Sequence, residues 1–127
     1  MKSIRKSDKT FEDYLEAMLI LQEQKGYIRS IDVAAHLQVT KPSVTYTTKR
    51  LKERGYITMN ADNLITITDE GMKIAEKIYF RHKMLTRFFI NLGVDEAIAL
   101  EDACKIEHDI SEETFDALCK HVEKYTP

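Results

Sequence analysis

The sequence predicts a mainly α-helical fold with one small β-hairpin. Three helical segments precede two short β-branched segments, and helical periodicity then continues almost to the last residue. A helix, a short helix, a tight turn, a third helix and a hairpin form the element order of a winged helix-turn-helix. We therefore expect a winged helix-turn-helix over residues 1–70 and a helical domain over residues 71–127.

Apolar residues at three- and four-residue spacing define the first three helices. The first is expected over residues 10–24, with Thr10 as its N-cap and apolar residues inward from Phe11 to Leu21. The second is expected over residues 30–37. The third is expected over residues 40–54, with Thr40 as its N-cap and Thr47 among its exposed positions. The side chains expected inward on these two helices are Ile31, Ala34, Ala35, Leu37, Val44, Thr48 and Leu51.

A hairpin and three further helices complete the expected elements. Residues 56–59 and 64–68 are short β-branched or aromatic segments, and residues 60–63 between them favour a turn. Thr68 caps a long helix whose last apolar position is Leu92. Asp95 caps a helix through about residue 108, and Ser111 caps a last helix through about residue 125.

The composition is that of an ordinary globular protein. Of the 127 residues, 43% are hydrophobic and 31% charged, which excludes disorder and collagen-like repeats, and two cysteines are too few for a disulfide framework. The most apolar stretch, residues 88–94, is far shorter than the ~20 residues of a membrane span. The basic N-terminus lacks the apolar run of a signal peptide. We expect a cytoplasmic protein with no membrane partner.

The charge is divided unevenly along the chain. Residues 1–54 contain 11 Lys and Arg against 7 Asp and Glu, whereas residues 55–127 contain 8 against 14. Such asymmetry favours a basic working surface in the first half, although ordinary surface variation accounts for it equally well. The net charge of −2 does not oppose DNA binding, because only the docking face must be positive.

The third helix carries residue types that contact double-stranded DNA. In a helix-turn-helix this helix enters the major groove, where hydroxyls bind phosphates or base edges and arginine reads guanine. The same polar face would also suit a solvated helix or a protein-docking module. The candidate DNA-binding residues are Arg29, Thr40, Lys41, Pro42, Ser43, Thr45, Tyr46, Lys49 and Arg50.

Six polar residues are candidate ligands for a divalent cation. Three stand at i, i+3 and i+4 and so share one face of the fifth expected helix, an acidic pair stands at i and i+3 on the first helix, and a histidine lies on the long helix. Thiolate, carboxylate and imidazole groups bind divalent transition metals, and three helices could bring them together. The six residues are Asp13, Glu16, His82, Cys104, Glu107 and His108.

Each group also has a plain structural interpretation. The acidic pair would favour the positive end of a helix dipole, the histidine on the long helix could simply be exposed, and the first cysteine could be a small core residue. Only such structural roles are assigned to His36, Cys119 and His121.

Four segments resemble the diphtheria-toxin repressor family of metal-activated bacterial transcription repressors in order and spacing. They are Phe-Glu-Asp-Tyr-Leu-Glu at residues 11–16, Ser-Val-Thr at 43–45, Arg-His at 81–82 and Asp-Ala-Cys-Lys-Ile-Glu-His at 102–108. The resemblance implies a homodimer that binds a palindromic operator when loaded with metal, one or two ions per subunit. It also implies that the helices after the wing dimerise, that the six candidate residues bind the metal, and that Glu107 bridges if two ions bind.

The resemblance leaves two types of metal site open. The manganese-type repressors match at Asp13, Glu16, His82, Glu107 and His108, but they more often have Glu at the position of Cys104. The iron-type repressors match at Cys104, Glu107 and His108, but they usually have Met at the position of Asp13. Oxygen donors suit Mn²⁺, and a thiolate favours Fe²⁺, Co²⁺ or Zn²⁺. We expect Mn²⁺ or Fe²⁺, with Mn²⁺ slightly favoured because Asp13 and Glu16 are both oxygen donors. The sequence given also ends without the SH3-like domain of the iron type, which favours the shorter manganese-type architecture. Zn²⁺ or Co²⁺ could bind in vitro.

No enzyme motif is present in the sequence. A nucleophile elbow, a phosphate loop and a zincin motif are all missing, so we expect neither catalysis nor a small organic substrate. The remaining alternative is a metal-independent winged-helix regulator or protein-docking module. Its thermal midpoint would not rise with added Mn²⁺ or Fe²⁺.

Overall fold

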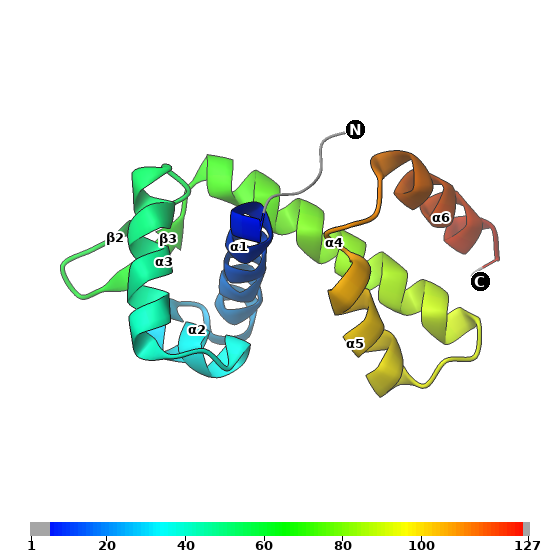
Figure 1. Cartoon of the computed structure of the whole chain (residues 1–127), viewed down its shortest axis with the longest axis horizontal. Coiled ribbons are helices and arrows are strands. Elements are labelled where there is room, and N and C mark those ends of the chain that lie inside the picture. Colours follow the sequence, from blue (N-terminus) through cyan, green and yellow to red (C-terminus); the bar gives the residue numbers. More distant parts are fainter. Residues whose placement is uncertain (1–5, 126–127) are drawn as a thin grey trace. The chain divides into compact units, whose positions relative to one another are not determined.

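The computed structural model describes residues 6–125, so the basic segment at residues 1–5 and residues 126–127 lie outside the described part (Figure 1). The described chain divides into two compact units, and the division falls between Glu76 and Lys77. This point lies inside the long helix α4 (Asp69–Asn91), so the helix contributes residues to both units.

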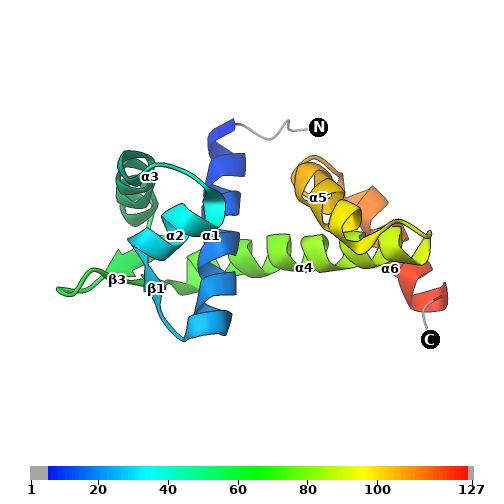
Figure 2. The same cartoon turned by 90° about the horizontal axis from the view of Figure 1, so that it is seen from below.

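The first unit is a helix-turn-helix with a small antiparallel sheet. Its elements in chain order are α1 (Lys6–Lys25), β1 (Ile28–Arg29), α2 (Ser30–Leu37), α3 (Lys41–Glu53), β2 (Ile57–Met59), β3 (Leu64–Ile67) and the start of α4 (Figure 2). The strands are ordered β1-β3-β2, so β3 lies in the middle. In Figure 1 the loop between β2 and β3 extends beyond α3 as the wing of the fold.

Helix α1 supplies the centre of this unit's core. Its predicted inward residues, from Phe11 to Leu21, are buried as expected. The helix begins at Lys6, however, so the prediction that Thr10 caps it is wrong. The polar residues before Phe11 carry no apolar periodicity, and the pattern therefore marked the first buried residue instead of the first helical one.

Helix α2 has the predicted bounds but a different buried face. Val33 and Ala34 are buried, whereas Ile31 and Ala35 are exposed, so the predicted inward set is partly wrong. An eight-residue helix has too few apolar positions to fix its phase, which packing against α1 and α3 decides instead. Gln38 adopts a left-handed conformation (φ 57°, ψ 46°) that makes the tight turn into α3.

Helix α3 begins as the sequence predicts. Thr40 is the N-cap, and its Oγ1 accepts a 3.2 Å hydrogen bond from the Ser43 backbone N–H. The predicted buried residues of this helix, from Val44 to Leu51, are indeed buried. Thr47 is also buried, which corrects its expected exposure and leaves one fewer hydroxyl on the outer face.

The second unit packs α5 (Glu96–Ile106) and α6 (Glu112–Tyr125) against the later part of α4. Its core contains Leu85, Ala103 and Phe115, one residue from each helix. Lys77 Nζ lies 2.6 Å from Glu112 Oε1, and this hydrogen bond lowers the pKa of the Glu112 carboxyl. The three predicted caps form, since Thr68, Asp95 and Ser111 side chains accept backbone N–H bonds at the starts of α4, α5 and α6.

Two predictions about this unit are wrong. Leu92 lies one residue beyond α4 and is exposed instead of inward. Helix α5 ends at Ile106, two residues earlier than expected, and Glu107 is its C-cap. Within the described residues, no helix is both long and apolar enough to cross a membrane.

Candidate metal centre and DNA-binding surface

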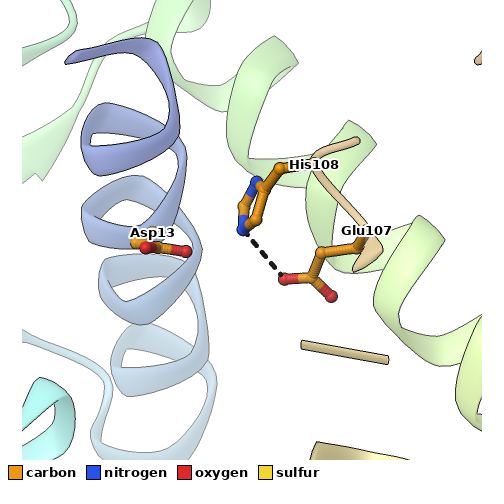
Figure 3. Close-up of side chains that lie close together, drawn as sticks. All are labelled: Asp13, Glu107 and His108. Atoms are coloured by element: carbon orange, nitrogen blue, oxygen red, sulfur yellow. Dashed lines mark ion pairs between the residues drawn. The ribbon is translucent and has the colours of Figure 1, made fainter. Parts of the chain in front are cut away.

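Glu107 is the centre of a cluster of metal-binding residue types in the second unit. Its side chain is 0% exposed, and its Oε2 lies 2.8 Å from Nδ1 of His82, which projects from α4 and is partly exposed. Its Oε1 lies 3.4 Å from Nε2 of His108, an ion pair drawn in Figure 3. His108 is also 0% exposed. A buried carboxylate therefore lies between two imidazole rings.

The buried Glu107 carboxylate is suited to a divalent cation. Glu107 Oε1 is buried and makes no hydrogen bond to the described residues, because its contact with His108 falls outside hydrogen-bond geometry. A buried carboxylate oxygen without a donor carries a desolvation cost that a cation would offset. Carboxylate oxygens and imidazole nitrogens are both ligands that bind Mn²⁺, Fe²⁺ and Zn²⁺.

The local chain path after α5 brings these side chains together. The Asp109 N–H donates to Ile106 O, which makes a tight turn at the point where the helix ends. Glu107 follows directly on the helix as its C-cap, with its N–H still bonded to Ala103 O, and the turn brings His108 beside it. Cys104 is exposed on α5, in contrast to the complete burial of Glu107 and His108.

Asp13 and Glu16 belong to the first unit, on α1, where Figure 3 labels Asp13. Glu16 is buried, although its carboxylate stands on a helix that otherwise buries apolar side chains, and Asp13 is partly exposed. A buried acidic residue in the middle of an apolar helix face is more typical of a functional site than of a residue that stabilises a helix terminus. Both residues lie well inside α1, so they do not serve its N-terminal dipole as the structural interpretation required.

The residues given only structural roles differ in their surroundings. Cys119 packs against the core of the second unit, and burial, followed by the charges of Asp116 and Glu123, raises the pKa of its thiol. His121 meets the Phe88 ring edge-on at 5.7 Å between centroids, and His36 is exposed at the end of α2.

The candidate DNA-binding residues lie on the outer face of α3 and in the segments that precede this helix. All are exposed except Arg50, which is partly buried. Arg50 Nη1 donates to Tyr46 Oη at 3.2 Å, and the guanidinium also lies 5.5 Å from the Phe11 ring centroid. Tyr46 therefore projects from α3 with its hydroxyl held by a cation. Such a surface suits the phosphates and base edges of DNA.

Sequence reasoning missed two features of these regions. Strand β1 attaches Arg29 to the sheet, because Arg29 pairs with Leu64 of β3. Arg81 is buried and bonded to the turn after α5, whereas the sequence shows only a basic residue beside His82. A two-residue strand and a buried cation leave no periodic signal in a single sequence.

The fold and the donor cluster define a winged-helix protein with metal-binding residue types in its helical unit. The family model of the iron-dependent repressor N-terminal DNA-binding domain matches residues 8–63. The model of the metal-binding and dimerisation domain of the same repressors matches residues 68–126. The chain belongs to the iron-dependent repressor family, which confirms the resemblance to metal-dependent repressors.

Individual relatives agree with this assignment. The transcriptional regulator MntR of Escherichia coli O157:H7 is 38% identical over 114 residues, which cover 90% of this chain and 74% of the relative. An uncharacterised helix-turn-helix transcriptional regulator of Methanocaldococcus jannaschii is 36% identical over 118 residues, covering 91% of this chain and 94% of the relative.

Solved structures share the fold. The metal-dependent transcriptional regulator MtsR matches with a TM-score of 0.81 and 26% identity, covering 89% of this chain and 53% of MtsR. A manganese-dependent transcriptional repressor in complex with manganese matches with a TM-score of 0.82 and 23% identity, covering 89% of this chain and 52% of the other. This chain spans about half the length of these two structures, and the mainly α-helical winged-helix prediction is confirmed.

Proposed function

We propose that this protein is a metal-activated transcriptional repressor that controls metal-ion homeostasis. In this proposal a metal-loaded homodimer binds a palindromic operator in double-stranded DNA, works in the cytoplasm and catalyses no reaction. The observation that carries the proposal is the buried Glu107 carboxylate between His82 and His108, in the segment matched by the metal-binding and dimerisation domain model.

The proposed ligand set extends beyond this cluster. We infer that Asp13 and Glu16 contribute oxygen ligands from α1, and that Cys104 contributes a thiolate at the edge of the site. Support comes from the acidic pair at i, i+3 spacing, the burial of Glu16 and the family membership of both halves of the chain. The proposed ion is Mn²⁺ or Fe²⁺, with Mn²⁺ slightly favoured because most of these donors are oxygen or imidazole nitrogen.

The ligands' own charges explain why activation would depend on a cation. Asp13, Glu16 and Glu107 repel one another when ionised together, and each resists losing water. The bound cation supplies the compensating positive charge. With ligands drawn from α1 and from the helical unit, the two recognition helices of the dimer are held about 34 Å apart, which matches successive major grooves. A 100-fold gain in operator affinity corresponds to about 2.7 kcal/mol of coupling.

The test is an anaerobic calorimetric titration of metal-stripped protein with Mn²⁺ and then Fe²⁺. We expect saturable binding that Glu107→Ala abolishes while the variant remains a folded dimer. The matched control is Glu101→Ala, which makes the same change at an exposed position of α5, the helix that Glu107 follows. Metal-dependent retention of selected duplex DNA should be lost in parallel. Normal metal-activated DNA binding by Glu107→Ala would refute the site assignment.

A further inference from the structure

Arg81 is a buried cation in the second unit whose partners are unusual for its charge. Its side chain is 5% exposed, and its guanidinium lies 5.2 Å from the centroid of the Phe115 ring. One nitrogen, Nη1, donates to two backbone carbonyls, that of Glu107 at 3.2 Å and that of Ile110 at 2.8 Å. Among the described residues, Arg81 makes no ion pair.

Burial of a guanidinium without a carboxylate partner is costly. Arginine is almost never this buried unless it is paired, because its charge loses hydration. Here two charge-assisted hydrogen bonds and the face of an aromatic ring replace water. Arg81 therefore acts mainly by fixing one backbone segment through hydrogen bonds, and not by stabilising the fold through an ion pair.

The backbone held by Arg81 is the turn that carries two proposed ligands. The carbonyls of Glu107 and Ile110 mark the first and last residues of the segment between α5 and Ser111. The side chains of Glu107 and His108 both project from this segment. The adjacent residue on α4, His82, bonds the Glu107 carboxylate, so α4 holds Glu107 by its main chain and by its side chain.

We propose that Arg81 is a positioning residue for metal binding, which fixes the turn from Glu107 to Ile110 so that the Glu107 and His108 side chains are arranged before an ion arrives. This inference rests on the proposed function of the cluster. Without the guanidinium, two buried carbonyls lose their donor and the turn gains other conformations. Ordering that turn on binding would then cost free energy and weaken the affinity for metal, as happens when groups that orient metal ligands are lost.

The experiment uses the full chain with Arg81→Met, which keeps an apolar stem of similar length, and Arg81→Lys, which keeps a charged donor. Mn²⁺ affinity is measured by calorimetry. Amide hydrogen exchange is measured in the metal-free protein at Glu107 and Asp109, whose N–H groups donate to Ala103 O and Ile106 O. The control is Leu85→Ala, which weakens the core of the same unit without removing a hydrogen bond to the turn.

We expect Arg81→Met to bind Mn²⁺ about 10- to 100-fold more weakly and to exchange these amides about tenfold faster. Arg81→Lys should recover part of both losses, because a single nitrogen makes both native bonds. Leu85→Ala should lower the thermal midpoint while leaving Mn²⁺ affinity unchanged. Should Arg81→Met not fold, Arg81→Gln carries the same expectation with a shorter neutral donor.

The outcomes separate this inference from the function on which it rests. Wild-type Mn²⁺ affinity in folded Arg81→Met or Arg81→Gln overturns the inference and leaves the metal site intact. An equal affinity loss in Leu85→Ala also overturns it, since general destabilisation would then suffice. Failure of the wild-type protein to bind Mn²⁺ overturns the proposed function, and this inference with it.

Discussion

Glu107 shows how one residue can carry the chemistry of a site. Both of its oxygens are removed from water, one is bonded to His82, and the other faces His108 without a hydrogen bond to the described residues. Breaking such a cluster by deleting one partner leaves the other buried groups uncompensated. If Glu107 binds the proposed ion, its position is already fixed by these contacts with His82 and His108.

Cys104 is the residue through which metal preference can be tested. We expect Cys104→Glu to shift selectivity toward Mn²⁺ over Co²⁺, because a hard carboxylate oxygen replaces a soft thiolate. The measurement is the ratio of Mn²⁺ to Co²⁺ affinity by calorimetry. Cys119→Ser is the matched control, since its sulfur packs against the core instead. An unchanged ratio in Cys104→Glu would exclude this cysteine as a ligand.

Thr40 couples the stability of α3 to one side-chain oxygen. Removing it in Thr40→Ala leaves the Ser43 N–H without its 3.2 Å acceptor and should lower the free energy of unfolding by about 1 kcal/mol. Thr40→Ser should retain most of that stability. Urea denaturation of the three proteins checks both values, and equal midpoints for Thr40→Ala and the wild-type protein would contradict the capping role.

Part of the candidate site was accessible from the sequence. The types and spacing of Glu107, His108 and His82 predicted a donor cluster, and these three side chains do lie together. The sequence did not predict that α5 stops at Ile106 or that Arg81 binds the turn that follows, because such contacts join residues far apart in the chain.

At the scale of elements, long periodic helices and side-chain caps were predictable. Thr40, Thr68, Asp95 and Ser111 all cap as expected, since capping depends on neighbours within three residues. Strand β1 was missed because two residues give no alternation, and its pairing with β3 depends on a contact distant in the chain. The buried face of the short α2 was likewise decided by its neighbours.

The junction of the wing with α4 depends on the absence of a side chain at Gly71. A Cβ there would lie 2.1 Å from the Tyr56 carbonyl oxygen and 3.0 Å from Ile67 Cγ2. The Tyr56 carbonyl also accepts the Thr68 N–H, so it cannot move without breaking that bond. The beginning of α4 is therefore packed backbone against backbone.

We expect Gly71→Ala to lower the free energy of unfolding by about 2–3 kcal/mol, through overpacking that outweighs the better helix propensity of alanine. Glu76→Ala, at an exposed position of the same helix, should change it by less than about 0.5 kcal/mol. Chemical denaturation followed by circular dichroism compares the two variants. A Gly71→Ala protein as stable as the wild-type protein would show that the approach to Tyr56 can relax.

At the scale of the whole molecule, metal binding should appear as stability. A ligand that binds only the folded state at 100 times its Kd adds about 2.7 kcal/mol, which corresponds to a rise of roughly 10 °C in the thermal midpoint for a chain of this size. We expect Mn²⁺ to produce this rise, a chelator to reverse it, and acidification to weaken it because the donors must be deprotonated. Mg²⁺ at equal concentration is the control. A similar rise in Glu107→Ala would contradict the assigned site.

The pairing of Ile28 with Ile65 affects the order in which the first unit folds. Most of that unit consists of helices whose contacts are local and form quickly, but this sheet closes a loop between residues far apart in the chain. During synthesis β1 leaves the ribosome long before β3 exists to receive it. Until then β1 has no partner strand, so the winged fold is completed by its last strands and not by α3.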